Sequence, residues 1–311
     1  MGMSTKSKQR LWSFSPSLYR ALSKTNTQDE FSIGVAVGEN FATIEKTATT
    51  AASVLTHAAV TDVPAAFVAD PFVIRVDATW YMFFEIMNRL NYLGCIGCAT
   101  SSDGHNWNYE RVVLEEPFHL AYPCVFEHEG EIFLVPDSIG NGVRLYRAAS
   151  SPNEWKLEKT LIPDKTLCDS SLFRYQNRWW AFCCDRSDSQ DTLRIFYANS
   201  LLGAWSEHAA GKICSPMDQR QAGRIIEQAG SLFRFVQNHN GEYGEYVRMR
   251  QIETLTPEVF SESEYFENPI LRGTGSGWNA DGMHHIDLCF GDAGSYLAIV
   301  DGIRRNRRTN A

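Results

Sequence analysis

The chain has 311 residues, of which 44% are hydrophobic and 21% are charged, and its formal net charge at pH 7 is −8. This length and composition indicate a globular protein with a large core, and the acidic balance shows no basic surface for nucleic-acid binding. No apolar run approaches the ~20 residues of a membrane-spanning helix, and residues 1–10 lack the apolar stretch of a secretory signal. We therefore expect a cytoplasmic protein with no membrane span and no nucleic-acid partner.

The N-terminal part of the chain changes character near residue 30. Residues 1–30 are polar and predict a weakly structured segment. Residues 31–38 alternate between apolar and small residues, which is typical of a strand. Residues 43–61 are rich in alanine and threonine, and we expect a loop or a short helix there.

One hairpin pattern then recurs along the chain. In residues 67–85 two apolar runs flank a polar turn at Asp77, with Asp70 in the first run and Glu85 at the end of the second. Four similar hairpins follow, over residues 121–137, 169–185, 223–237 and 284–301. Their exit residues are Glu85, Asp137, Asp185, Gln237 and Asp301, at intervals of 52, 48, 52 and 64 residues.

A third and a fourth strand follow the hairpin in three of the repeats, and the fourth opens near Trp107, Trp155 or Trp205. A period near fifty residues with four short strands predicts an all-β fold, a five-bladed β-propeller. We expect the tryptophans to pack between blades. The last repeat leaves little chain for its outer strands, so residues 31–38 are predicted to complete that blade and close the ring. The predicted propeller covers residues 31–303, and residues 304–311 form a basic tail.

The inner strands of a propeller all begin on one face, so their polar entrance residues should surround the central axis. Exit residues return to the same face one strand further out. Carboxylate, guanidinium, phenol and imidazole groups around a funnel suit a hydroxyl-rich ligand. The candidate ligand-binding residues are His119, Tyr122, Asp137, Asp185, Arg224, Gln237, His284, His285 and Asp287. Two structural alternatives stand beside this interpretation: Asp70, which precedes Pro71, can simply form a turn, and Arg224 can pair with Asp169 across the axis.

Metal binding has weak support in the sequence. The eight cysteines include one CxxC, at Cys95 and Cys98, and no second pair to complete a zinc site; we expect them to be reduced. His285 and Asp287 share one face of a predicted strand, and calcium requires more oxygen ligands than this pair supplies. The sequence predicts no cofactor, with an axial cation near His285 as the alternative.

Several motifs in combination resemble a known family. They are residues 67–72 (Phe-Val-Ala-Asp-Pro-Phe), 115–123 (Glu-Glu-Pro-Phe-His-Leu-Ala-Tyr-Pro), 144–148 (Arg-Leu-Tyr-Arg-Ala), 221–224 (Gln-Ala-Gly-Arg) and 281–287 (Asp-Gly-Met-His-His-Ile-Asp). Together they resemble the N-terminal five-bladed domain of plant glucosamine inositolphosphorylceramide transferases and related bacterial proteins. That domain is similar to glycoside hydrolase family 43.

The resemblance implies an inverting mechanism, in which an Asp acts as general base and a Glu as general acid while a second Asp tunes the acid. Asp70 matches the base, and Asp169 is in place on the third inner strand. Tyr122 stands where these hydrolases can have Asp, and the Glu-Gly-Pro signature of the acid is represented only by residues 221–224. A substitute acid is therefore needed, for which Glu85, Asp137 and Asp169 are candidates; our catalytic set is Asp70, Glu85 and Asp169.

Three functions follow from these observations. The first is a glycoside hydrolase-like enzyme that acts on a glycan or glycoconjugate at the propeller mouth. The second is a non-catalytic propeller that binds a glycan or sugar nucleotide and serves a glycosyltransferase partner, which the missing acid signature favours. The third is a protein-interaction propeller, against which the polar strand entrances count.

Overall fold

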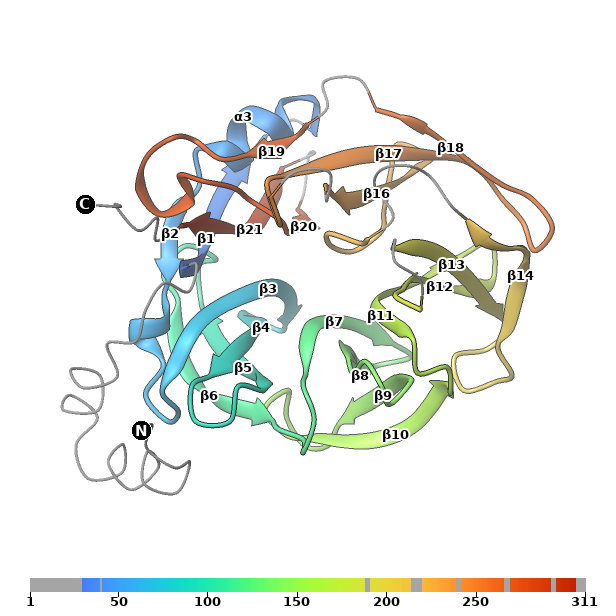
Figure 1. Cartoon of the computed structure of the whole chain (residues 1–311), viewed down its shortest axis with the longest axis horizontal. Coiled ribbons are helices and arrows are strands. Elements are labelled where there is room, and N and C mark those ends of the chain that lie inside the picture. Colours follow the sequence, from blue (N-terminus) through green and yellow to red (C-terminus); the bar gives the residue numbers. More distant parts are fainter. Residues whose placement is uncertain are drawn as a thin grey trace.

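Five antiparallel sheets are arranged in a ring in the computed structural model, which describes residues 30–39, 41–187, 191–213, 220–238, 242–265, 269–291 and 295–305 (Figure 1). In four of the sheets the strands run in chain order from the axis outward, joined by hairpins, whereas the fifth combines strands from both ends of the described chain. The predicted five-bladed β-propeller, with about four strands in each blade, is confirmed.

The blades are numbered from the first complete repeat. Blade 1 contains β3 (Ala65–Val76), β4 (Thr79–Asn88), β5 (Gly94–Ser101) and β6 (Asn108–Leu114). Blade 2 contains β7 (Ala121–His128), β8 (Glu131–Asp137), β9 (Val143–Ala148) and β10 (Trp155–Ile162). Blade 3 contains β11 (Leu167–Tyr175), β12 (Arg178–Asp185), β13 (Thr192–Ala198) and β14 (Ser206–Ile213).

Blade 4 contains β15 (Ile226–Gln228), β16 (Ser231–Gln237), β17 (Tyr246–Leu255) and β18 (Phe260–Glu264), with the short β19 (Leu271–Arg272) paired to β17. Its inner strand was expected to begin at Gly223, but the regular ladder starts only at Ile226. Before this ladder, Gln221 forms an isolated bridge to Val236. The chain then turns toward blade 5, and the Ala222 carbonyl accepts the backbone N–H of Ile286 from that blade.

Blade 5 is built from both ends of the described chain. Its inner strands are β20 (Ile286–Phe290) and β21 (Tyr296–Arg304), and β1 (Glu30–Gly38) pairs with β21 along its whole length. This confirms that an N-terminal strand closes the ring. Residues 43–61 contain the expected short helix, α3 (Ile44–Thr49), with two 3-10 turns, and also β2 (Ala52–Leu55), which the sequence did not predict and which adds the outermost strand.

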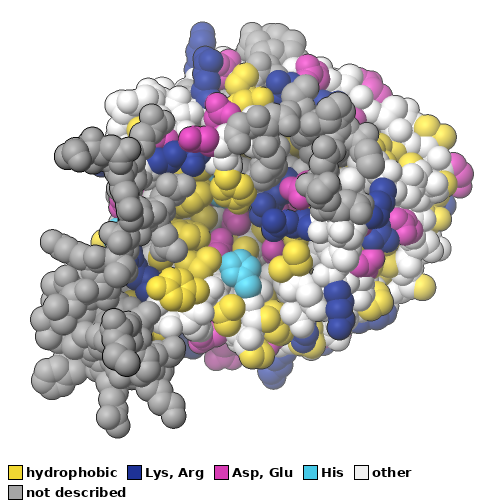
Figure 2. Space-filling model, viewed as in Figure 1, with side chains coloured by type: hydrophobic (Ala, Val, Ile, Leu, Met, Phe, Trp, Pro, Cys, Tyr) yellow, Lys and Arg dark blue, Asp and Glu magenta, His cyan; other side chains and the backbone are white. Residues whose placement is uncertain are grey.

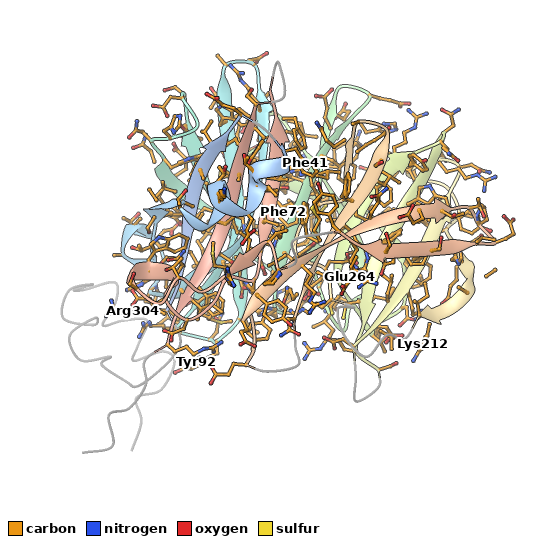
Figure 3. All side chains as sticks on the ribbon, turned by 90° about the horizontal axis from the view of Figure 1, so that it is seen from above. Phe41, Phe72, Tyr92, Lys212, Glu264 and Arg304 are labelled. Atoms are coloured by element: carbon orange, nitrogen blue, oxygen red, sulfur yellow. The ribbon has the colours of Figure 1, made fainter. Side chains whose placement is uncertain are left out.

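Apolar side chains fill the spaces between neighbouring blades. Each predicted tryptophan packs against a core cluster drawn from two blades, and Trp155 contacts Phe83 of blade 1 with ring centroids 5.3 Å apart. In the side view Phe72 lies in the middle of the molecule, between the two faces of the ring (Figure 3). Fully burying such side chains contributes roughly 1.5–3 kcal/mol each, so the blades are joined mainly by apolar contacts.

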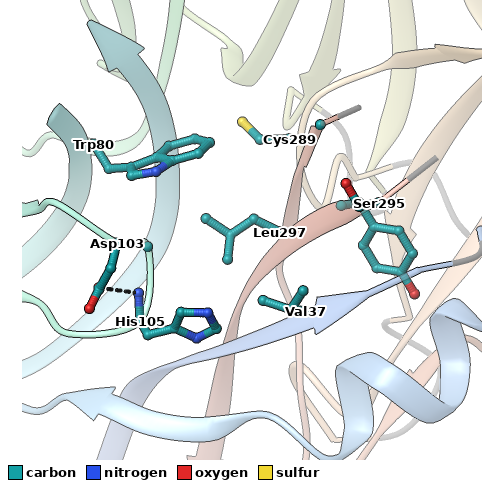
Figure 4. A pocket seen from close by; sticks show the side chains of 10 residues that line it. Val37, Trp80, Asp103, His105, Cys289, Ser295 and Leu297 are labelled. Atoms are coloured by element: carbon teal, nitrogen blue, oxygen red, sulfur yellow. Dashed lines mark hydrogen bonds between the residues drawn. The ribbon is translucent and has the colours of Figure 1, made fainter. Parts of the chain in front are cut away.

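The two faces of the ring differ in chemistry. At the strand ends opposite Glu85 and Asp301, the seam between blades 1 and 5 contains a cavity of about 210 Å³ with an apolar floor (Figure 4). Leu297, Val37 and Trp80 line it together with His105, whose backbone N–H donates to Asp103. The seven cysteines in the described part of the chain are free, as expected for reduced thiols. The buried acidic side chains lie toward the other face, where the strands end at Glu85 and Asp301.

Candidate functional site at the propeller axis

A recurring backbone irregularity turns one residue of each of the first three inner strands out of the ladder. Asp70, Tyr122 and Asp169 have φ values of 52°, 45° and 43°. Each lies in a bulge where the register with the second strand is interrupted. Bulges re-aim side chains, and a left-handed backbone at a residue other than glycine costs of order 1–3 kcal/mol. The surrounding structure therefore has to hold these residues in place.

Four buried carboxyl groups meet at the axis. Asp70 and Asp169 come from the bulges, while Glu85 and Asp137 come from the ends of β4 and β8. Figure 2 shows acidic side chains at the bottom of a central depression, with histidine and basic side chains beside them. The structure thus brings together the three predicted catalytic residues and Asp137.

Burial is the main reason that these carboxyl groups are hard to ionise. It raises the pKa of Asp70 to about 7 and that of Asp137 to about 8, and it raises the pKa of Glu85 well above its usual range. Neighbouring carboxylates add to the effect, since Asp70 and Asp169 both raise the pKa of Glu85. At neutral pH burial therefore favours the protonated forms of Glu85 and Asp137, and Asp70 titrates near pH 7.

An ion pair of blade 5 holds Asp70. Asp301 accepts hydrogen bonds from the Asp70 backbone N–H at 2.9 Å and the His284 backbone N–H at 3.2 Å, and its Oδ1 lies 2.6 Å from His284 Nδ1. Burial alone would lower the pKa of His284, but the Asp301 carboxylate outweighs it and the pKa is raised. Burial alone would raise the pKa of Asp301, and His284 reverses that as well. Each partner thus favours the charged form of the other.

A second ion pair stands opposite. The guanidinium of Arg220 donates to Asp169 and lies 5.4 Å from the ring centroid of Tyr243, whose ring also packs against His284. Arg224, which the sequence suggested as an alternative partner of Asp169, does not pair with it. Arg224 instead donates to Asp287 and to the backbone carbonyl of Val73. Arg220, Tyr243 and Asp301 were not among the predicted site residues: the first two lie outside the strands and carry no repeat signal.

The remaining candidate residues lie at the rim of the site, at its floor, or outside it. His119 is at the rim: its Nδ1 accepts from Gly94 N–H at 2.9 Å, its Nε2 lies 3.6 Å from Glu85 Oε1, and burial lowers its pKa. Gln237 donates to the Gln221 carbonyl. Asp185 lies elsewhere, paired with Arg194 and Lys212 within blade 3.

Tyr122 and His285 form the floor of the site. The Tyr122 hydroxyl accepts from Gly223 N–H, donates to the Gly223 carbonyl and lies 2.8 Å from Ser171 Oγ, so it joins blades 2, 3 and 4. His285 is fully buried between the rings of Phe72 and Tyr122, and burial lowers its pKa to about 4. These side chains serve the packing of the ring.

A metal ion fits the described residues poorly. The atoms that lie within 4.8 Å of one another belong to Asp70, His284 and Asp301, rather than to His285 and Asp287. His285 and Asp287 were predicted to share one face of a strand, but residues 283–285 precede the regular strand, so that alternation does not extend to His285. Asp287 accepts hydrogen bonds from Val73 N–H and Arg224 instead. His284 and Asp301 are hydrogen-bonded to each other, and calcium requires six to eight oxygens. The described residues at the axis therefore do not supply the ligand set of a calcium ion.

Together, the fold and the site define a five-bladed propeller with an acidic mouth at its axis. The chain belongs to the family described as Glucosamine inositolphosphorylceramide transferase 1, N-terminal, whose family model matches residues 28–303. The resemblance inferred from the motifs is thereby confirmed.

Proteins from two plants support this assignment to the family. The chain is 40% identical over 258 residues to Glucosamine inositolphosphorylceramide transferase 1 of Oryza sativa subsp. japonica, which covers 78% of the chain and 34% of the relative. It is 34% identical over 251 residues to the Arabidopsis thaliana protein of the same name, over 78% of the chain and 33% of the relative. The chain thus spans about a third of the length of these relatives.

Solved structures show the same fold. A thermostable family-43 glycoside hydrolase has a TM-score of 0.57 at 13% identity, covering 76% of this chain and 89% of its own. The α-L-arabinofuranosidase PaAbf62A of Podospora anserina has a TM-score of 0.57 at 14% identity, covering 78% of this chain and 92% of its own.

Within the described part of the chain, none of the helices is both long and apolar enough to cross a membrane.

Proposed function

We propose that the axial mouth binds a glycan or glycoconjugate and that Asp70 and Glu85 hydrolyse a glycosidic bond with inversion, Asp70 as general base and Glu85 as general acid. The observation that supports this is the difference in ionisation among carboxyl groups in one buried cluster. Burial raises the pKa of Glu85 and so favours the protonated form that a proton donor needs. Asp70 titrates near pH 7, where a general base is most effective.

The ion pairs favour Glu85 over Asp169 as the general acid of this proposal. Asp169 is engaged by Arg220, so its carboxylate serves to hold a guanidinium, and Glu85 is the better proton donor. The pair of Asp301 and His284 fixes the Asp70 backbone and places a positive charge near its carboxylate. Loss of a proton by Glu85 to a leaving oxygen would leave a carboxylate near Arg220, whose charge favours that ionised form.

A groove beside the mouth offers room for a longer ligand. It has a volume of about 680 Å³ and is lined by Glu242 and Glu245, in the same loop as Tyr243, by Tyr246 at the start of β17, and by Arg272 and Asp281. Its carboxylate, guanidinium and phenol groups can hydrogen-bond to the hydroxyl groups of a sugar. A glycan whose terminal residue enters the mouth can extend along this groove.

A second candidate function is a binding domain that serves a glycosyltransferase. Gln221, fully buried, stands where the acid signature of family 43 would be, and an amide cannot donate a catalytic proton. The plant relatives are named as transferases, and the chain matches about a third of their length. In this case the same mouth would bind a sugar without cleaving it.

A glycan panel followed by NMR distinguishes these functions. We expect the protein to release a sugar whose initial anomeric configuration is inverted, and we expect Asp70→Asn and Glu85→Gln each to slow the reaction by at least about 100-fold. Glycan binding without any product would support the binding domain. The proposal fails if no glycan of the panel is bound or cleaved.

A further inference from the structure

The linker between blades 1 and 2 is fastened to the strand beside Glu85. Gly94, the first residue of β5, donates its backbone N–H to His119 Nδ1 at 2.9 Å, and its carbonyl accepts the Leu120 N–H at 3.0 Å. A Cβ at Gly94 would lie 2.2 Å from the Leu120 carbonyl oxygen. It would also lie 2.8 Å from His119 Cε1 and 3.0 Å from Glu85 Oε1. The absence of a side chain at Gly94 therefore lets the imidazole ring and the carboxyl group approach each other.

The hydrogen bond to Gly94 determines where the proton of the His119 ring lies. A ring nitrogen that accepts a hydrogen bond carries no proton, so the ring is neutral and Nε2 is the protonated nitrogen. Burial lowers the pKa of His119, which favours the same neutral ring. Nε2 lies 3.6 Å from Glu85 Oε1, a buried oxygen with no hydrogen-bond partner among the described residues. The ring thus brings an N–H donor close to the carboxyl group proposed as the general acid.

We infer that His119 is a positioning residue for Glu85, whose carboxylate accepts the Nε2–H of His119 once Glu85 has given up its proton. The inference rests on the proposed function in one respect, namely that Glu85 is the general acid. At 3.6 Å the two atoms are beyond hydrogen-bonding range in the free protein, and catalytic hydrogen bonds often shorten only in the complex with substrate. A hydrogen bond that forms only with the ionised acid stabilises the transition state more than the ground state.

The proton of His119 stays on its ring throughout the step. Glu85 gives its proton to the glycosidic oxygen, which leaves with the electron pair of the broken C–O bond. The oxygen of a water molecule bonds to the anomeric carbon, and Asp70 takes a proton from that water. Asp70 then returns a proton to solvent and Glu85 takes one up, so that both carboxyl groups regain their starting forms.

Two amide variants separate the roles of the two ring nitrogens. In His119→Asn the amide oxygen stands near the position of Nδ1 and can still accept from Gly94, whereas in His119→Gln the amide N–H stands near Nε2 and can still donate to Glu85. The other charged groups that act on Glu85 stay in place in both variants. They are Asp70, Asp137 and Asp169, which raise its pKa, and Arg220, which lowers it; Asp169 and Arg220 also act on His119.

The two variants should differ in rate and in stability, in opposite directions. In His119→Asn we expect kcat to fall about 10- to 100-fold with KM changed by less than about threefold, because the donor to the ionised acid is lost. In His119→Gln we expect a fall of no more than about threefold. Urea denaturation should give the reverse order, since Gln leaves the Gly94 N–H without its acceptor. A merely structural role for His119 predicts the same order in both measurements.

The pH–rate profile and a matched control complete the kinetics. The basic limb reports the ionisation of the acid, and it should move to higher pH in His119→Asn but not in His119→Gln, because a donor to the carboxylate lowers the pKa of Glu85. His128→Asn is the control: His128 Nε2 also lies 3.6 Å from a glutamate oxygen, that of Glu129, at the turn between β7 and β8. It should change neither rate nor profile.

NMR of isotopically labelled protein needs no substrate and separates this inference from the proposed function. We expect a protonated Nε2 in His119, and a Glu85 carboxyl group that titrates at higher pH in His119→Asn than in His119→Gln. A proton on Nδ1 instead, equal Glu85 titrations, or equal rates of glycan cleavage in the two variants would overturn the inference. If the NMR results are as expected and no glycan is cleaved, the hydrolase fails and the contact of His119 with Glu85 stands.

Discussion

Replacing Asp137 by Asn should stabilise the protein, although the residue is buried in the candidate site. The carboxyl group is 7% exposed and accepts the Ile139 backbone N–H at 2.9 Å through Oδ1, a bond that the Asn carbonyl can retain. Burial, followed by repulsion from Asp169, raises the pKa of Asp137 to about 8. The protonated acid and the amide have the same shape and charge.

The size of the effect follows from this pKa. A carboxyl group whose pKa is higher in the folded state takes up a proton on folding, so stability is greatest at low pH and falls as the pH rises from 3.8 to about 8. At pH 7 the shift corresponds to roughly 4 kcal/mol, at 1.36 kcal/mol for each pKa unit. Neighbouring carboxyl groups share in the titration, so we expect Asp137→Asn to gain about 2–4 kcal/mol at pH 7 and under about 1 kcal/mol at pH 4.

Urea denaturation followed by tryptophan fluorescence at several pH values measures this gain. Asp77→Asn is the matched control, since Asp77 is exposed at a hairpin turn with a φ of 53°, which Asn also adopts; it should show no pH-dependent difference. A variant Asp137→Asn that loses stability by the same amount at every pH would refute the claim that this carboxyl group is protonated in the folded protein.

Three further substitutions test how the site is held. Gly223→Ala should destabilise the protein by more than about 3 kcal/mol or prevent folding, because a Cβ there would lie 1.8 Å from the Ile286 carbonyl oxygen. Tyr122→Phe should cost about 1–3 kcal/mol in urea denaturation, because the Gly223 N–H loses its acceptor. Arg220→Met should cost about 3–5 kcal/mol at pH 7, because Asp169 is left as an unpaired buried charge.

Each of the three has a control or a contradicting outcome. Gly230→Ala, at a turn of blade 4 with open space around it, should cost only about 1 kcal/mol; equal losses at both glycines would contradict the close-approach argument. Tyr197→Phe, whose ring packs on Trp180 in blade 3, should be nearly neutral. For Arg220→Met, a free energy of unfolding at pH 7 equal to that of the unmodified protein would contradict the ion-pair argument.

Local periodicity determined the fold. Alternating apolar runs, polar turns and a repeat near fifty residues define strands and blades without reference to distant contacts, and the alternation in residues 31–38 indicates the strand that completes the last blade. β2 could not be predicted in this way, because four residues carry too little alternation and its pairing with β1 depends on the closed ring. The same reasoning brought Asp70, Glu85, Asp137 and Asp169 to one face.

The partners of these acids were decided only by the tertiary structure. Asp137 and Asp185 occupy the same position in their repeats, yet one joins the axial cluster and the other pairs with Arg194, because the direction of a side chain at a strand end depends on the bulges and loops around it. Arg220 and Tyr243 lie in irregular segments. A sequence repeat indicates which strand ends lie on the face of the mouth, whereas the direction of each side chain and the pairing of buried charges depend on distances between blades that no local pattern encodes.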